Sequence, residues 1–240
     1  MADTPPYQRV LLKLSGEALM GDREFGIDPA VLRQYAAEIR DVADLGVQMG
    51  IVIGGGNIYR GVTNSTDGID KVTGDHMGMM ATIINALALQ SALEHEGLVT
   101  RLMSAIRMDV VAEPFIRRRA VRHLEKGRVV IFGAGSGMPF FSTDTVAAQR
   151  ALEVGCEIIL LAKQGVDGVY DADPRTNPNA KRYSDLTYDE YLAKDLKVAD
   201  ATAISLARDN NISMLVFNLD EPGNILRAVA GEPIGTFVHV

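Results

Sequence analysis

The chain has 240 residues, of which 47% are hydrophobic and 23% are charged, and its net charge is −7 at pH 7. These are values of an ordinary globular protein, and they exclude a chain that is disordered, collagen-like or a coiled coil throughout. Because Lys and Arg must displace counterions to bind nucleic acid, so acidic a chain is not expected to have DNA, RNA or an anionic membrane as its partner.

Short, almost continuously apolar segments alternate with longer segments of helical spacing. The apolar segments predict strands at 9–14, 47–53, 99–103, 128–132, 157–161 and 213–217. The longer segments predict helices at 29–46, 75–96, 113–126, 143–154, 198–210 and 222–230. Strands that are apolar on both sides are typical of a parallel sheet covered by helices. We therefore expect an α/β fold, a three-layer αβα sandwich with a mainly parallel open sheet.

The first strand carries a lysine near its end. Lys13 faces away from its neighbours in a segment that is expected to be buried, where it would need an anionic partner. Ser15 and Gly16 then form a tight turn whose backbone N–H groups are able to approach an anion. The alternative is a surface lysine at a strand end.

Three consecutive glycines, residues 54–56, follow the second strand, and Arg60 comes four residues later. Such a run weakens regular structure, and it indicates close approach of a ligand or another backbone. Exposed N–H groups and an arginine suit a phosphate, although a flexible loop with an unrelated arginine is the alternative.

The next two segments have simpler explanations. For Asp75 the simpler explanation, a cap for the helix that follows it, is the alternative to a ligand contact, whereas Met77, Met79 and Met80 are expected to fill gaps in the core or between subunits. The basic segment 117–128 is expected to be a solvated helix face or a contact between subunits, with a nucleic-acid patch as the alternative.

A second glycine-rich turn follows the fourth strand at 133–137 and leads to Ser142, Thr143 and Asp144 at a predicted helix start. Asp144 is either the helix cap or an acidic group at the mouth of the sheet, near the end of the strand that carries Lys13. In open α/β sheets, ligands bind beyond the carboxyl ends of the strands. Two anion cradles with a lysine, an arginine and an aspartate are typical of phosphoryl transfer between two polyanions.

Several other classes of site lack their motifs. No segment matches the P-loop or the full GxGxxG fingerprint, and no CxxC, HExxH or GxSxG occurs. With one cysteine, Cys156, no internal disulfide bond forms, which favours a reducing cytoplasm. Residues 1–8 lack the pattern of a signal peptide, and the longest apolar stretch, 77–93, contains too many polar residues for a membrane span. Without a Gly/Ser-rich or Pro-rich linker, residues 1–240 are expected to form a single domain.

At this point the motifs resemble the amino acid kinase superfamily. The segment 13–16, the triple glycine with Asn57 and Arg60, and the segment 171–174 carry this likeness. The segments 74–82 and 139–144 resemble those of the bacterial uridylate (UMP) kinases within it. The resemblance implies a cytoplasmic homohexamer that uses MgATP to convert UMP reversibly to UDP in pyrimidine nucleotide biosynthesis. Activation by GTP and inhibition by UTP are also implied.

The resemblance implies a role for individual residues, with Lys13, Arg60 and Asp144 as the catalytic groups. The expected ATP-binding residues are Lys13, Leu14, Ser15, Gly16, Gly56, Arg60, Gln164, Tyr170 and Asp173. The expected UMP-binding residues are Gly55, Asp75, Ser136, Gly137, Met138, Pro139, Phe140, Phe141, Ser142 and Thr143. The segment matching the one linked to GTP is Gly21, Asp22, Arg23, Glu24, Phe25 and Gly26. Asp200 is expected to assist Asp144, and Mg²⁺ is expected to arrive with ATP, without protein ligands of its own.

The chain departs from this family at two places. Met138 stands where the family commonly has asparagine, so an amide contact is lost there. The stretch 162–165 varies in length among relatives, which leaves Lys163 and Gly165 as alternatives to Gln164. Another kinase of the superfamily, acting on an acylglutamate, a carbamate or aspartate, and a nucleotide sensor without catalysis remain as alternative functions.

Overall fold

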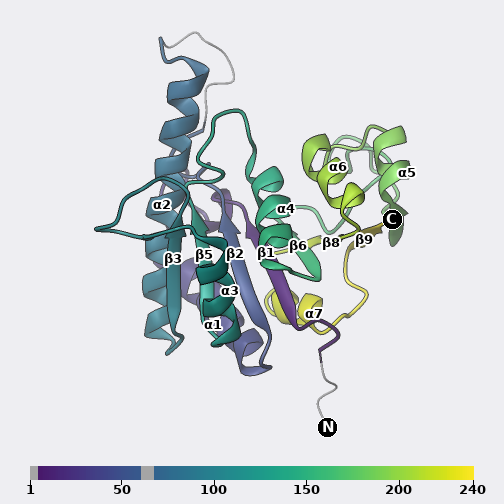
Figure 1. Ribbon diagram of the computed structural model, residues 1–240. Helices are drawn as coiled ribbons and strands as arrows, with labels where there is room; N and C mark the ends of the chain where they lie inside the picture. Colours follow the sequence, from purple (N-terminus) through teal and green to yellow (C-terminus); the bar gives the residue numbers. More distant parts are fainter. Residues whose placement is uncertain (1–4, 61–67) are drawn as a thin grey trace.

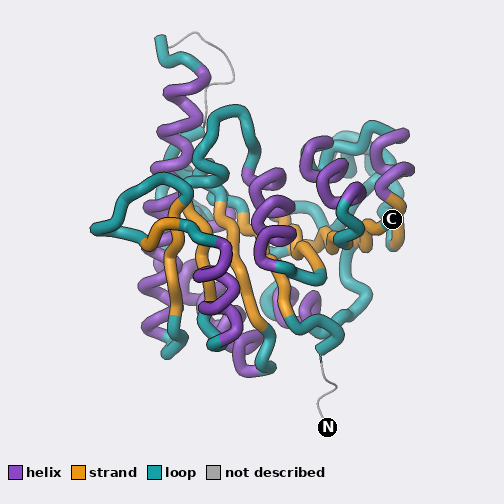
Figure 2. The backbone as a smooth tube through the Cα atoms, viewed as in Figure 1, coloured by secondary structure: helices purple, strands orange, loops and turns teal. Residues whose placement is uncertain are grey.

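A computed structural model describes residues 5–60 and 68–240. These residues form one sheet of nine strands in the order β4-β3-β5-β2-β1-β6-β8-β9-β7. Every neighbouring pair is parallel except β8 and β9, which run antiparallel. Helices cover both faces of the sheet, so that the strands lie between two helical layers in Figures 1 and 2. The expected three-layer α/β fold is thereby confirmed.

The six strands expected from the sequence all form, within two residues at either end. The strands are β1 (Arg9–Leu14), β2 (Gln48–Ile53), β3 (Thr100–Ser104), β5 (Val129–Gly133), β6 (Ile158–Lys163) and β8 (Ser213–Asn218). All six are adjacent in the sheet and are covered on both faces, which is why their sequences are apolar without a break.

Two groups of helices pack on opposite faces of this sheet. One face carries α1 (Pro29–Asp44), α2 (Lys71–His95) and α7 (Asn224–Val229). The other face carries α3 (Arg117–Glu125), α4 (Thr143–Val154), α5 (Tyr188–Ala193) and α6 (Ala201–Asp209). Each strand contributes alternate side chains to the two cores: Val10, Leu12 and Leu14 of β1 face α1 and α2, whereas Leu11 faces α4.

Helix α2 begins four residues earlier than expected, and helix α3 begins four residues later. Helix α2 begins at Lys71 because Asp70 caps it, accepting hydrogen bonds from the backbone of Val72 and Thr73. Asp75 is therefore not the cap but lies in the second turn. Helix α3 begins at Arg117, and the residues expected to start it form the short edge strand β4 (Glu113–Pro114).

Four short elements were not expected from the sequence. They are the 3₁₀ turn η1 (Glu17–Leu19), helix α5, and strands β7 (Asp185–Thr187) and β9 (Thr236–His239). Between β6 and β7, residues 171–181 form a mostly exposed, turn-rich segment that is closed by a bridge between Tyr170 and Arg182. Among the described residues, no helix is both long and apolar enough to cross a membrane.

Candidate functional site

The first and sixth strands end beside each other, at the point where the chain changes direction across the sheet. From β1 the order continues through β2 and β5 on one side, and from β6 through β8 and β9 on the other. In open α/β sheets this switch point is where ligands bind. Lys13 near the end of β1 and Lys163 at the end of β6 both face the α4 layer. The residue before each lysine points to the other core, and side chains alternate along a strand.

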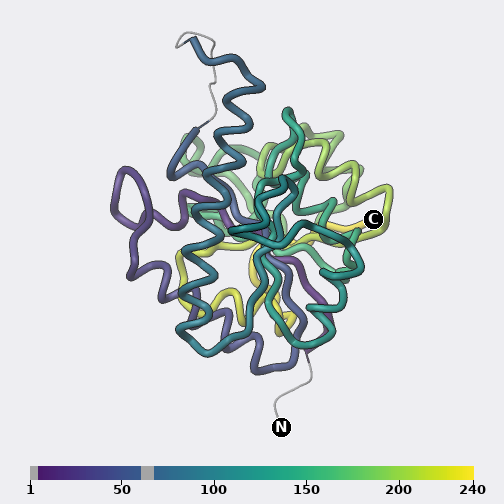
Figure 3. Tube along the Cα trace, turned by 60° about the vertical axis from the view of Figure 1, so that its left-hand side comes forward, coloured from purple at the N-terminus to yellow at the C-terminus, as the bar shows by residue number. Residues whose placement is uncertain are grey.

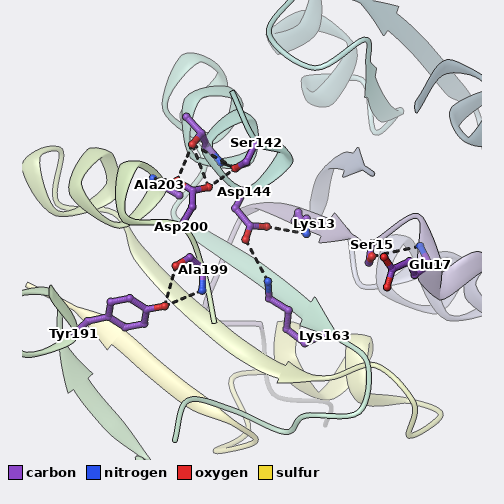
Figure 4. Close-up of polar contacts among 11 residues, drawn as sticks. Lys13, Ser15, Glu17, Ser142, Asp144, Lys163, Tyr191, Ala199, Asp200 and Ala203 are labelled. Carbon is purple, nitrogen blue, oxygen red and sulfur yellow. Dashed lines mark hydrogen bonds and ion pairs between the residues drawn. The ribbon is translucent and has the colours of Figure 1, made fainter. Parts of the chain in front are cut away.

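Asp144, in the first turn of α4, lies between these two lysines (Figure 4). Its Oδ1 is 2.7 Å from Lys13 Nζ, and its Oδ2 is 3.2 Å from Lys163 Nζ. Burial disfavours the charged carboxylate, but the two ammonium groups outweigh burial and hold the pKa of Asp144 below its ordinary value. Burial also lowers the pKa of Lys163, against the opposing attraction of Asp144. The buried lysine expected from β1 thus has its anionic partner.

The N-terminus of α4 is capped by Ser142 and not by Asp144. The Ser142 hydroxyl accepts a hydrogen bond from the backbone N–H of Thr145. The same hydroxyl donates to Asp200, which also accepts from the Thr145 hydroxyl at 2.9 Å. With the cap provided by Ser142, the Asp144 carboxylate is left for the lysines, and the partial positive charge of the helix end faces the same crevice.

Asp200 is itself held in place at the start of α6. It caps this helix by accepting from the backbone of Ala203 at 2.9 Å. The preceding residue, Ala199, is bound by the buried phenol of Tyr191, which accepts from its N–H at 2.7 Å and donates to its carbonyl at 3.0 Å. Burial raises the pKa of Tyr191 to about 12, so this phenol stays a donor at neutral pH.

The glycine-rich loop after β2 packs directly on the turn after β1. A Cβ at Gly54 would lie 2.9 Å from the backbone nitrogen of Gly16 and 3.7 Å from Thr143 Oγ1. The three junctions singled out in the sequence therefore meet at one place. Arg60 is exposed at the rim, where it pairs with Glu17 at 2.5 Å.

The loop after β5 contains two non-glycine residues with left-handed backbones, Ala134 (φ 59°) and Phe140 (φ 71°). Such conformations cost about 1 kcal/mol or more, and they persist only where the surroundings hold them. Helix α2 does so for both: Thr82 Oγ1 accepts from the backbone of Ala134 at 2.9 Å, and Asp75 accepts from that of Phe140 at 2.8 Å. Lys71 pairs with Asp75 at 2.6 Å.

Two cavities lie near the lysine–aspartate group. The larger one, about 540 Å³, is lined by Lys163 and by three residues expected to bind the adenine and ribose of ATP: Gln164, Tyr170 and Asp173. The smaller one, about 140 Å³, lies between α2 and the loop after β5. Six of its lining residues are among those expected to bind UMP or its phosphate: Gly55, Asp75, Ser136, Met138, Phe141 and Thr143.

The remaining expected residues lie around these cavities. Gly56 lines the smaller cavity, although the resemblance assigns it to ATP. Gly137, Pro139 and Phe140 belong to the same loop without lining that cavity, and Phe140 is 69% exposed. Leu14 is fully buried and offers only its backbone. The turn 21–26 lies outside both cavities and loops out from the body at the left of Figure 3.

Lys163 was expected only as an alternative to Gln164, and no role was expected for Thr82 or Asn85, although the structure places all three at the site. Gln164, Lys163 and Gly165 all line the larger cavity, but only the side chain of Lys163 reaches Asp144. A lysine that ends a buried strand, as Lys13 nearly does, was the available signal. Thr82 and Asn85 give no such signal, because a polar residue in a long helix usually faces solvent.

The described residues contain no group of three or more Asp, Glu, His or Cys side chains that could hold a metal ion. One buried carboxylate oxygen, Oδ1 of Asp144, has no hydrogen-bond donor among them, apart from its ion pair with Lys13. Mg²⁺ is commonly bound by one or two carboxylates together with the phosphates of a nucleotide. The donor set thus fits a cation that is carried by a nucleotide, and it does not fit a metal caged by protein alone.

The fold agrees with comparisons with known proteins. The model of the amino acid kinase family matches residues 8–218. A uridylate kinase of Ruegeria sp. (strain TM1040) is 59% identical over 239 residues, which is 100% of this chain and 96% of that enzyme. A uridylate kinase of Cutibacterium acnes (strain DSM 16379 / KPA171202) is 58% identical over 97% of this chain and 98% of its own length. The crystal structure of UMP kinase from Bacillus anthracis superposes with a TM-score of 0.95 at 46% identity, covering 98% of this chain and 96% of its own.

Proposed function

The chain belongs to the amino acid kinase family, and we propose that it is a uridylate kinase, which transfers the γ-phosphoryl group of ATP to UMP and yields ADP and UDP. The observation that carries this proposal is the buried group of Lys13, Asp144 and Lys163 at the switch point, with one cavity on each side. The uridylate kinases that it resembles over its whole length support the choice of acceptor.

In this proposal the larger cavity takes the nucleoside of ATP, and the smaller one takes UMP. The phosphates of both would meet at the turn of Ser15 and Gly16, the loop 54–56 and the N-terminus of α4. Backbone N–H groups of tight turns and of a helix N-terminus suit phosphate oxygens. Arg60 would exchange Glu17 for a phosphate at the rim.

Phosphoryl transfer needs positioning and positive charge more than covalent chemistry. Lys13 and Lys163 would stabilise the negative charge on the transferred group, and Asp144 would hold both ammonium groups in place. The UMP phosphate is already an anionic nucleophile, so no general base is required. Asp144 would be the carboxylate that faces the Mg²⁺ carried by ATP, and this ion would supply positive charge that neutralises part of the phosphate charge.

The proposal extends to assembly, regulation and location. Four apolar residues form an exposed stripe along α2, and they suit the homohexamer that the family implies: Met77, Met80, Ile84 and Leu87. GTP as activator and UTP as inhibitor belong to the same proposal. The GTP part of this proposal is supported by two hydrogen bonds that join the turn at Gly26 to Asn57 of the glycine-rich loop. A reducing cytoplasm suits the lone buried thiol of Cys156, whose pKa burial raises to about 12.

An acceptor screen tests the proposed function. ADP release from MgATP would be measured with UMP, CMP, dUMP, acetylglutamate, carbamate and aspartate. Strong turnover with UMP supports the proposal. Turnover only with an amino-acid or carbamate acceptor would keep the family and reject the substrate, and tight nucleotide binding without turnover would indicate a sensor. Omitting Mg²⁺ should abolish turnover with every acceptor.

A further inference from the structure

Two asparagine side chains, Asn57 and Asn85, face each other below the glycine-rich loop that follows β2. Both residues are buried, with exposed fractions of 2% and 0%. Asn57 Nδ2 donates to Asn85 Oδ1 at 2.9 Å, and Asn85 Nδ2 donates to Asn57 Oδ1 at 2.6 Å. This reciprocal pair leaves one further N–H on each amide.

Both remaining N–H groups bind backbone carbonyls of other segments. Asn85 Nδ2 donates to the carbonyl of Gly54 at 2.7 Å, and Asn57 Nδ2 donates to that of Gly26 at 2.9 Å. The backbone N–H of Gly26 in turn donates to the carbonyl of Asn57 at 2.9 Å. The amide pair thus joins the middle of α2 to the glycine-rich loop and to the turn before α1.

The turn after β1 rests on the same atoms. A Cβ at Gly16 would lie 2.6 Å from Asn57 Oδ1 and 2.7 Å from the carbonyl oxygen of Gly54. These are the two oxygens to which Asn85 Nδ2 donates. Any movement of Asn85 is therefore passed on to the loop 54–56 and to the turn of Ser15 and Gly16.

The face of α2 that carries Asn85 also holds the loop on the other side of the site. Residues 75, 82 and 85 are separated by seven and three positions, so they lie on one side of the helix. Asp75 and Thr82 bind the backbone of Phe140 and Ala134, as described above. A single rigid helix thus fixes the two phosphate cradles relative to each other.

We propose that Asn85 is a positioning residue for phosphoryl transfer. Through Asn57 and Gly54 it sets the place of the loop 54–56 and of the turn of Ser15 and Gly16, without touching either nucleotide. This inference rests on the proposed function. A misplacement of about 1 Å between reacting groups can reduce a rate about 100-fold. Nothing else in the described chain donates a side-chain hydrogen bond to the Gly54 carbonyl.

Asn85→Leu removes both donors and keeps the number and branching of the side-chain heavy atoms. Leu89→Ala is the matched control, because Leu89 is equally buried in α2, one turn away, and contacts the apolar core. Both variants should lower the melting temperature. We expect Asn85→Leu to lower kcat with UMP and MgATP by 10-fold to 100-fold and to raise the KM for ATP, whereas Leu89→Ala keeps wild-type values per folded molecule.

Asn85→Asp provides a second test that does not depend on the leucine variant folding. A buried carboxyl has a raised pKa, and its neutral form keeps one O–H donor for Gly54, whereas its ionised form has none. The kcat of Asn85→Asp relative to the wild type should therefore rise as the pH is lowered from 8 to 6. The same ratio for Asn85→Leu should stay flat.

The outcomes separate the two proposals. If the wild type does not turn over UMP, the proposed function fails. If the wild type is active, while Asn85→Asp and any folded Asn85→Leu match Leu89→Ala in kcat and both KM values at every pH, Asn85 is only part of the core and the inference is overturned.

Discussion

Three charged side chains meet at the end of β1, and their mutual distances determine what each can do. Lys13 is 6% exposed, so its ammonium group has lost most of its water and depends on Asp144. A buried ion pair of this kind contributes little net stability, but it holds a charge ready in a place of low polarity. We therefore expect the effects of changing these residues to differ between activity and stability.

Lys13→Ala should act on the chemical step. Loss of one preorganised electrostatic group typically raises the barrier by about 2.7–4 kcal/mol, so kcat should fall roughly 100-fold to 1,000-fold. Binding of ATP and UMP, measured by titration calorimetry, should change much less. Lys126→Ala, at an exposed position on the far end of α3, is the control. A kcat within a few-fold of the wild type would remove Lys13 from the catalytic group.

Asp75→Asn should act on the acceptor. Asp75 lines the smaller cavity and accepts from the backbone of Phe140, and its charge pairs with Lys71. A hydrogen bond to a charged group is worth about 1.5–3 kcal/mol, so the KM for UMP should rise about 10-fold or more. Steady-state kinetics should leave kcat and the KM for ATP near their wild-type values. An unchanged KM for UMP would reduce Asp75 to a residue that only orders the loop.

Asp144→Asn should lower stability in a pH-dependent way. The folded-state pKa of Asp144 is lowered, because Lys13 and Lys163 outweigh the effect of burial. The carboxylate then stabilises the fold fully above its unfolded pKa of about 3.9 and loses this effect as the pH falls through the lower, folded value. Leaving two buried lysines unpaired should cost about 3 kcal/mol at pH 7.

Urea unfolding at pH 7, 5 and 3 measures this difference. The difference should be equal at pH 7 and 5 and smaller at pH 3, below the unfolded pKa of the Asp144 carboxyl, where the unfolded chain binds the proton more readily than the folded protein does. Asp195→Asn, which breaks an exposed pair with Lys197, should change nothing at any of these values. If the stability loss of Asp144→Asn is as large at pH 3 as at pH 7, the ion pair with the two lysines is not its cause.

At the scale of elements, helix α2 organises the site. It holds both left-handed residues of the loop after β5, and its backbone lies against the loop after β2. A Cβ at Gly55 would lie 2.8 Å from Ala81 Cβ and 2.9 Å from the carbonyl oxygen of Gly78. The triple glycine is thus required at this position by contact with a helix, in addition to any contact with phosphate.

Two Gly→Ala changes test this contact, with opposite signs. Gly55→Ala should lower the free energy of unfolding by about 1–3 kcal/mol, because the backbone of α2 cannot move aside. Gly78→Ala places its Cβ in open space within the helix, so it should raise the same quantity by about 0.5–1 kcal/mol. Denaturant unfolding measures both. If both variants change the free energy of unfolding by the same amount in the same direction, the loop 54–56 moves to accommodate the added Cβ without cost.

The elements that could be predicted from sequence are those buried on both faces. The bounds of strand β1 and helix α4 were predicted to the residue. A turn with Gly16 follows the end of β1, and α4 begins after the capping Ser142 and ends before Gly155. Strands β4 and β7 at the two edges of the sheet, and β9 beside β7, have two to four residues and few apolar positions, so their pairing depends on neighbours that are distant in sequence. The start of α2 was misplaced because its first turn is exposed and carries no apolar pattern.

The site was predictable to a similar degree. Lys13 and Asp144 were expected near each other because both follow strand ends, where α/β sheets bind ligands. The role of Lys163 was not predicted, although its place at the end of a buried strand was an available signal. The amide pair of Asn57 and Asn85 depends on a contact between residues 28 positions apart, which one sequence does not reveal.

At the scale of the whole molecule, α2 has apolar residues on all sides although only one side faces the sheet. On the outer side the exposed residues follow helical spacing at Met77, Met80, Ile84 and Leu87, and the N-terminal end of the helix extends beyond the strands in Figure 1. A continuous exposed apolar stripe on a soluble domain commonly marks a contact with another protein. A second copy of this chain is the partner that the proposed homohexamer requires.

Ile84→Glu tests this contact. Ile84 is 50% exposed at the centre of the stripe, and a charge there would have to be buried without a partner between two copies. Sedimentation velocity should show an oligomer for the wild type and a smaller species for the variant. Val110→Glu places the same charge on a fully exposed valine outside α2, in the loop before β4, and should sediment as the wild type does. An Ile84→Glu protein that stays fully assembled would place the subunit contact elsewhere. Because the opposite face of α2 holds both phosphate cradles, we also expect the disassembled variant to lose kcat while it remains folded.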